Sequence, residues 1–286
     1  MLGTSRPWRV GERARERNFF YHTGIVQQMT NLSAWGLVRG IEPMSLCDWP
    51  GRLSAVVFFG GCNLRCPHCH NAALAWRPEA TPPMAEKAVR RFLDSRKRWL
   101  DGLVVTGGEP TLVPGLPGFA VAIAALGLPV TVDSNGLRPD VLAALLAAHP
   151  DIHLAVDVKA PFAKYPLVTG NAVSADAARQ CLGEVFALAA AHPGRIRFRT
   201  TCVPELSEAD LREVRSAVPA GHALALQPFR PISRHGKERI DAQADSKTRR
   251  LSGDVVHPAH CPGDLKGPQG QRHPGSAARH AACGQG

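Results

Sequence analysis

The chain has 286 residues, of which 44% are apolar and 20% are charged, a composition typical of a folded globular protein rather than a disordered one. Its formal net charge is +10. Residues 1–28 and 231–286 carry seven of these ten units, while residues 29–230 hold 20 basic and 17 acidic side chains. Since no basic stripe interleaved with aromatic residues runs through that middle part, the charge does not indicate a nucleic-acid partner.

Neither a membrane segment nor a secretory signal is visible in the sequence. No run of apolar residues reaches the roughly 18 that a membrane helix needs, and the Arg-rich N-terminus lacks the apolar core of a signal peptide. We therefore expect a cytoplasmic protein without a membrane partner. The eight cysteines are too few for a dense disulfide framework, which favours metal or cofactor chemistry for the three that cluster tightly.

The regular part of the chain follows an N-terminal segment, 1–28, which is rich in Arg, lacks apolar periodicity and is interpreted as a flexible basic arm. The predicted strands are 54–59, 102–106, 129–133, 151–158, 195–202 and 223–227, and the predicted helices are 84–100, 116–126, 139–148, 174–191 and 208–218. This alternation predicts an α/β fold with a parallel sheet and helical crossovers, closed or partly closed into a barrel. A doubly wound open sheet is the competing architecture.

The pattern stops at residue 231. Residues 231–286 contain no Phe, Trp or Tyr, and Gly and Pro occupy 13 of these 56 positions. Such a segment buries too little apolar surface to offset the entropy of ordering it, so we predict a disordered tail over 232–286. One interpretation of the abrupt change is an aberrant, out-of-frame tail.

The strongest chemical signal is Cys62-Asn-Leu-Arg-Cys66-Pro-His-Cys69, which follows the first predicted strand. Thiolates are the ligands of iron–sulfur clusters, and three of them leave one iron of a [4Fe–4S] cluster open for another ligand. The alternatives are a zinc site completed by His68 or His70, and incidental loop cysteines. Three further cysteines are isolated in the sequence, and we expect them to pack as small apolar side chains. They are Cys47, Cys181 and Cys202.

The C-x3-C-x2-C motif after a first strand resembles the cluster motif of the radical S-adenosylmethionine (radical SAM) enzymes. With the flanking segments 45–51, 56–63 and 69–71, it resembles the activating proteins of anaerobic ribonucleotide reductase, and more distantly the pyruvate formate-lyase activating enzymes. The resemblance covers about residues 36–231. It implies a partial (β/α)6 TIM-like barrel, a catalytic domain over 29–231 and a [4Fe–4S] cluster bound by the three clustered cysteines.

A second motif, Gly107-Gly108-Glu109, ends the second predicted strand. On its own it is equally typical of a tight turn. Together with the cysteines it resembles the Gly-Gly-Glu element of the family, in which the glycine backbone and the carboxylate approach the amino group of SAM. Glycine permits that close approach, and carboxylate or carbonyl oxygens accept hydrogen bonds from an ammonium group.

Two later strand ends carry further polar residues, namely Asp133 and Ser134, and then Asp157 and Lys159. From the residues alone, an ordinary turn and an ion pair are the favoured explanations. The resemblance implies instead that they lie beside SAM, with the Asp residues near a bound monovalent cation. Lys159 would then meet the carboxylate of SAM as a point charge.

The resemblance implies a function as well. An enzyme of this kind takes one electron from a low-potential donor, cleaves SAM to methionine and a 5′-deoxyadenosyl radical, and generates a glycyl radical on a partner enzyme. The partner implied is anaerobic ribonucleoside-triphosphate reductase. Two alternatives stay open, a radical SAM enzyme that acts on a small molecule and a non-enzymatic zinc-binding protein.

Overall fold

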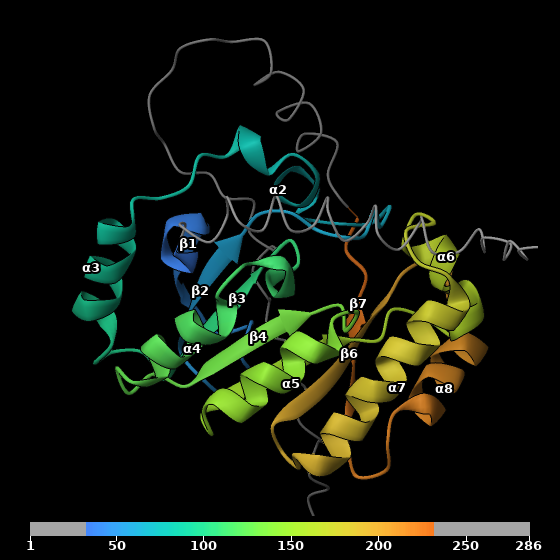
Figure 1. Cartoon of the computed structure of the whole chain (residues 1–286). Coiled ribbons are helices and arrows are strands. Elements are labelled where there is room, and N and C mark those ends of the chain that lie inside the picture. The colour runs from blue at the N-terminus through green and yellow to red at the C-terminus, as the bar shows by residue number, and fades with distance from the viewer. Residues whose placement is uncertain (1–32, 232–286) are drawn as a thin grey trace, which may run out of the picture.

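The computed structural model describes residues 33–231 (Figure 1). The predicted flexible arm and disordered tail, 1–28 and 232–286, lie outside the described residues. The described part contains one seven-stranded sheet, in which the spatial order of the strands is their order in the sequence. Its strands are β1 (Val38–Ser45), β2 (Ser54–Phe59), β3 (Gly102–Gly107), β4 (Val130–Ser134), β5 (Ile152–Asp157), β6 (Ile196–Cys202) and β7 (Leu224–Pro228).

The six strands β2 to β7 are parallel to one another and confirm the predicted parallel sheet. A doubly wound sheet needs a point at which the strand order reverses. No reversal occurs between β2 and β7, so that alternative is wrong and the partial-barrel prediction is confirmed. Within the described residues the first and last strands of the sheet do not pair, and the barrel is therefore open on one side.

Strand β1 is the strand that the sequence pattern did not indicate, and the short helices α2 (Ala72–Trp76) and α6 (Tyr165–Val168) were not predicted either. Strand β1 pairs antiparallel with β2 at the edge of the sheet, with register shifts on both sides of Gly40–Glu42. Its sequence contains Pro43, which cannot donate to a sheet ladder and is tolerated at an edge. The resulting lack of clean alternation explains why periodicity alone did not predict this strand.

The helices connect successive parallel strands, and α4, α5 and α7 lie along one face of the sheet (Figure 1). Short 3-10 helices η1 to η4 occupy Ala34–Leu37, Pro78–Ala80, Pro110–Leu112 and Phe162–Lys164. The α-helices are α2 (Ala72–Trp76), α3 (Glu86–Arg96), α4 (Leu116–Ala124), α5 (Pro139–Ala148), α6 (Tyr165–Val168), α7 (Ala175–Ala191) and α8 (Glu208–Ala217).

Helix boundaries follow their local capping chemistry. The Ser174 side chain accepts a hydrogen bond from the Ala177 N–H at the start of α7, and Ser207 and Asp210 form a reciprocal capping box at the start of α8. The predicted helix 84–100 is shorter in the structure, because the Met84 N–H bonds to the Val38 carbonyl. That bond holds the chain extended until α3 begins at Glu86.

Strands β2, β3 and β4 are almost entirely buried on both faces, as expected for strands covered by helices. The last parallel strand, β7, is instead mostly exposed. One face of β2 and β3 packs with the helices, and its side chains, such as Val57, Phe59 and Val105, belong to the main core. The opposite, inner face holds a smaller apolar cluster around Trp49 and Phe58. Polar side chains replace apolar ones on this inner face toward the carboxyl ends of β4, β5 and β6.

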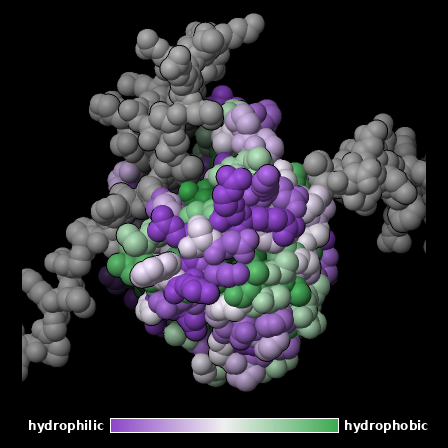
Figure 2. Space-filling view, turned by 90° about the vertical axis from the view of Figure 1, so that its left-hand side faces the viewer, coloured by the Kyte–Doolittle hydropathy of each residue, from purple (hydrophilic) through white to green (hydrophobic). Residues whose placement is uncertain are grey.

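The outer surface is mixed in character. On the side of the molecule that carries α3, hydrophilic and hydrophobic residues are interspersed (Figure 2). Cys47 is exposed, so the prediction that it packs as a small apolar residue is wrong. In the loop between β1 and β2, Trp49 is buried instead. Among residues 33–231 no helix has the length and apolar character needed to cross a bilayer.

Candidate active site

A pocket opens at the carboxyl ends of the parallel strands, where barrel enzymes place their active sites. Loops after β2, β3, β4 and β5 contribute to it, together with inward side chains of β6. All ten residues singled out from the sequence line this pocket: Cys62, Cys66, Cys69, Gly107, Gly108, Glu109, Asp133, Ser134, Asp157 and Lys159.

The cysteine loop, residues 60–71, is tied down at several points. The Gly61 N–H bonds to the Leu74 carbonyl at 3.0 Å, and the Arg65 N–H bonds to the Thr169 carbonyl at 3.1 Å. The Asn71 side chain donates to the Gly107 carbonyl at 3.0 Å. These bonds fix the loop against β3 and against the segment after α6, so the three thiols face the pocket in a defined arrangement.

The three thiols are free of disulfides. Burial raises the pKa of Cys62 to about 11 and also raises the pKa of Cys69. Among residues 33–231, no three His, Cys, Asp or Glu side chains gather closely enough to hold one metal ion. Three thiols that line one pocket suit a cluster, since each thiolate would bind a different iron atom. The donor set therefore fits a [4Fe–4S] cluster.

The two histidines proposed as a fourth zinc ligand have other partners. His68 Nε2 lies 2.7 Å from Glu205 Oε1, and His70 Nε2 lies 2.8 Å from the carbonyl oxygen of Arg230. Glu205 follows β6 and Arg230 follows β7, so the two histidines link the first parallel strand of the barrel to its last two. These contacts disfavour the zinc interpretation, and nothing in the local sequence around Glu205 pointed to them.

The two glycines of Gly-Gly-Glu are required by close backbone packing. Gly107 has φ of +119°, and a Cβ there would lie 2.1 Å from the Phe59 carbonyl oxygen. A Cβ on Gly108 would lie 1.9 Å from the Gly61 carbonyl oxygen. Only glycine fits at either position, and the backbone of this turn consequently lies against the cysteine loop.

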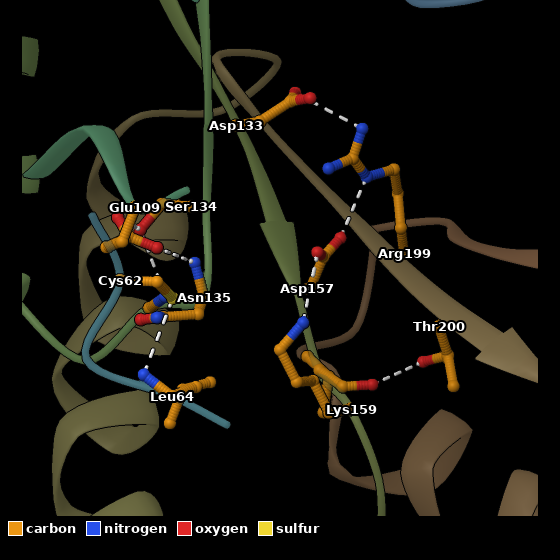
Figure 3. A network of polar contacts seen from close by, with 12 residues as sticks. Cys62, Leu64, Glu109, Asp133, Ser134, Asn135, Asp157, Lys159, Arg199 and Thr200 are labelled. Carbon is orange, nitrogen blue, oxygen red and sulfur yellow. Dashed lines mark hydrogen bonds and ion pairs between the residues drawn. The ribbon is translucent and has the colours of Figure 1, made fainter. Parts of the chain in front are cut away.

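Glu109 is almost fully buried, at 2% exposure, and is bound by donors from two strand ends (Figure 3). Its Oε1 accepts from Thr111 N, Thr111 Oγ1 and Ser134 Oγ at 3.2, 2.6 and 2.9 Å. Its Oε2 accepts from the Asn135 N–H at 2.8 Å. Burial raises the pKa of Glu109, although these donors oppose the shift. One lone pair of Oε2 remains for a further donor.

A row of alternating charges crosses the other side of the pocket (Figure 3). Arg199 Nη1 lies 3.2 Å from Asp133 Oδ1, and Arg199 Nε lies 2.9 Å from Asp157 Oδ1. Asp157 Oδ2 lies 3.4 Å from Lys159 Nζ. The row contains the Asp157–Lys159 ion pair that was the alternative interpretation of these two residues. It also contains Arg199, which was not singled out from the sequence, although alternation along β6 placed it on the inner face.

Burial and charge act in opposite directions on these carboxyl groups. Burial raises the pKa of Asp133 by more than the positive charge of Arg199 lowers it. Burial also acts to raise the pKa of Asp157, but the charges of Arg199 and Lys159 outweigh it and lower that pKa. The pKa of Lys159 is raised, because the attraction of Asp157 and nearby groups exceeds the cost of burial. Asp157 and Lys159 therefore form a charged pair.

Comparison with known proteins places this pocket in a family. Residues 56–218, more than half of the chain, match the Radical SAM superfamily. The chain belongs to the radical SAM superfamily. The matched residues contain the cysteine loop, the Gly-Gly-Glu turn and the charged row. Superfamily membership implies S-adenosylmethionine and a [4Fe–4S] cluster as cofactors and makes this chain a radical SAM oxidoreductase.

Individual relatives agree with this assignment. The radical SAM chain is 31% identical over 219 residues to "Putative glycyl-radical enzyme activating enzyme MJ1227" of Methanocaldococcus jannaschii, covering 75% of this chain and 90% of that protein. It is 36% identical over 108 residues to the pyruvate formate-lyase-activating enzyme of Clostridium pasteurianum, covering 35% of this chain and 44% of that enzyme.

Among solved structures, Streptococcus suis SuiB bound to its precursor peptide SuiA has the same fold, with a TM-score of 0.50 and 12% identity. The match covers 85% of this radical SAM chain and 53% of SuiB. At this identity the likeness concerns the fold alone.

Proposed function

We propose that this protein is a glycyl-radical-enzyme activating enzyme and that its partner is anaerobic ribonucleoside-triphosphate reductase. The single observation that carries the proposal is the pocket in which the three thiols of C-x3-C-x2-C meet the Gly-Gly-Glu turn and the charged row. Similarity to "Putative glycyl-radical enzyme activating enzyme MJ1227" over 90% of its length supports the activase class. The flanking segments 45–51, 56–63 and 69–71 are the basis for the choice of partner.

Different residues of the pocket would bind the cluster and SAM. Cys62, Cys66 and Cys69 would hold the [4Fe–4S] cluster and leave one iron open to SAM. When bound, these cofactors supply a one-electron reductive cleavage that generates a carbon-centred radical able to take a hydrogen atom from a glycine Cα. The protein holds the ligands in place and excludes water around them.

The polar groups would orient SAM by its methionyl end. The backbone of Gly107 and Gly108 and the remaining lone pair on Glu109 Oε2 can accept hydrogen bonds from its ammonium group. Lys159 offers a positive charge to its carboxylate. Asp133, Ser134 and Asp157 would line the same end of the bound molecule and hold these groups in position.

The remaining parts of the proposal concern the whole chain. The catalytic unit is residues 29–231, and the electron comes from a low-potential donor. We place the enzyme in the cytoplasm, where such donors and the partner would meet it.

Anaerobic reconstitution tests the proposal in two steps. Loaded protein should release 5′-deoxyadenosine from SAM under reduction, and with the anaerobic ribonucleotide reductase of the same organism it should produce a glycyl radical signal in electron paramagnetic resonance. The Cys62→Ala variant should lose both, and Cys181→Ala, outside the pocket, should lose neither. Cleavage without a glycyl radical, or with modification of a small molecule, would reject the proposed partner; zinc in place of iron and sulfide would reject the class.

A further inference from the structure

The two carboxylates expected beside a monovalent cation already have a cation from the protein itself. The guanidinium group of Arg199 lies between Asp133 and Asp157 and bonds to both (Figure 3). We propose that Arg199 is the built-in counter-cation of these two carboxylates, so that the site binds SAM without a monovalent metal ion. The inference rests on the proposed function only in naming SAM as the ligand.

The geometry of the row leaves no carboxylate unpaired. Arg199 uses Nη1 for Asp133 and Nε for Asp157, at 3.2 and 2.9 Å, and the planar fork of arginine fixes both bonds at once. The side chains of Arg199 and Asp133 are each only 14% exposed. Asp133 Oδ1 and Asp157 Oδ1, hard oxygens of the kind that a monovalent ion binds, therefore already accept hydrogen bonds from Arg199.

The surrounding charge also disfavours an added ion. Arg197 lies two residues before Arg199 on the same face of β6, and its positive charge acts on both Asp133 and Asp157. Its Nε is buried and has no hydrogen-bond partner within the described residues. With Lys159 at the end of the row, three cations act on the carboxylates of Asp133, Asp157 and Asp48, so these negative charges are balanced without an added ion.

Arg199 consequently acts as a positioning residue. It holds Asp157 by Oδ1, which leaves Asp157 Oδ2 directed at Lys159 Nζ, 3.4 Å away. Lys159 lines the pocket. Because Arg199 orients Asp157 and Asp157 orients Lys159, the position of the Lys159 charge depends on Arg199. In a site built around a bound metal ion, that orientation would depend on the ion instead.

The experiment compares alkali-metal salts with tetramethylammonium chloride at constant ionic strength, because tetramethylammonium is too large to enter the row. For the cluster-loaded full chain, the Kd for SAM should change by less than twofold between KCl, NaCl and tetramethylammonium chloride. The Arg199→Ala variant should bind SAM at least tenfold more weakly in tetramethylammonium chloride and recover affinity in KCl or NaCl. Arg212→Ala, which removes an arginine that is 71% exposed on α8, should behave as wild type.

Two measurements without SAM keep this inference separate from the proposed function. The melting temperature of the wild type should be equal in the three salts, and that of Arg199→Ala should rise in KCl or NaCl. Titration of the wild type with thallium(I), a potassium mimic observable by nuclear magnetic resonance, should show no saturable site. Saturable thallium binding that Asp133→Asn abolishes, or a wild type whose SAM affinity falls fivefold without alkali ions, would overturn the inference. Failure to bind SAM in any salt would overturn the proposed function instead.

Discussion

Glu109, which follows β3, accepts a hydrogen bond at 2.8 Å from the main-chain N–H of Asn135, which follows β4. The Asn135 side chain in turn donates to Asn63 Oδ1 in the cysteine loop, also at 2.8 Å. Three loops from three neighbouring strands are thereby connected through one asparagine. The Gly-Gly-Glu turn accordingly holds the site together in addition to any contact it makes with a ligand.

Replacing Glu109 with Gln should destabilise the fold and weaken SAM binding together. The Gln amide presents an NH2 group to donors that now meet a carboxylate oxygen, and a buried donor left unsatisfied costs about 2 kcal/mol. Urea denaturation measures the loss. Glu86→Gln, at an exposed i,i+4 pair on α3, should change the unfolding free energy by less than about 0.5 kcal/mol. Equal effects of the two substitutions would contradict the connecting role of Glu109.

Gly108→Ala should disrupt the site through sterics alone. The added Cβ would lie 1.9 Å from the Gly61 carbonyl oxygen, so the turn and the cysteine loop must separate, at a cost of about 3 kcal/mol. We expect a lower melting temperature and loss of iron after reconstitution. Gly183→Ala is the matched control, because its Cβ meets no atom within 4 Å in α7 and should stabilise the helix by about 0.5–1 kcal/mol.

Lys159→Met should separate SAM binding from cluster binding. The substitution removes a charge that lines the pocket, while Asp157 keeps its bond to Arg199. A lost charge-assisted hydrogen bond of about 1.4 kcal/mol corresponds to a tenfold rise in the Kd for SAM. Iron and sulfide content should be unchanged. The control Lys97→Met, at an exposed pair with Asp94, should leave the Kd as it is; a loss of iron in Lys159→Met would contradict this assignment.

The acid stability of the fold should depend on Asp210. Hydrogen bonds from Lys164 Nζ and from Ser207 lower the pKa of Asp210 to about 2, from an ordinary value of 3.8. Because the folded-state pKa is the lower one, the stabilisation is complete above pH 3.8 and is lost as the pH falls toward 2. Asp210→Asn should be less stable than wild type at pH 6, and the difference should vanish near pH 2.

Chemical denaturation at a series of pH values measures that difference. Glu208→Gln serves as the control on the same helix, since its carboxylate is 92% exposed and 3.6 Å from Arg212. An Asp210→Asn variant whose deficit stays constant from pH 6 to pH 2 would contradict the prediction.

The sequence by itself determined the features that depend on short stretches of chain. The spacing of Cys62, Cys66 and Cys69, the alternation of strands and helices, and the capping box at Ser207 are all local. The parallel sheet then follows, since helical crossovers return each strand in the same direction. The gathering of the predicted residues at one edge of the sheet follows from that direction as well.

The tertiary structure alone decided which side chain meets which. Arg199 bonds to residues 66 and 42 positions earlier in the chain, and His68 bonds to a carboxylate 137 positions later. Periodicity reveals the face of a strand on which a side chain lies, but it carries no information about the partner across the barrel. For that reason the family resemblance implied a monovalent ion beside Asp133 and Asp157, and only their approach to Arg199 in the folded barrel identified a cation within the chain.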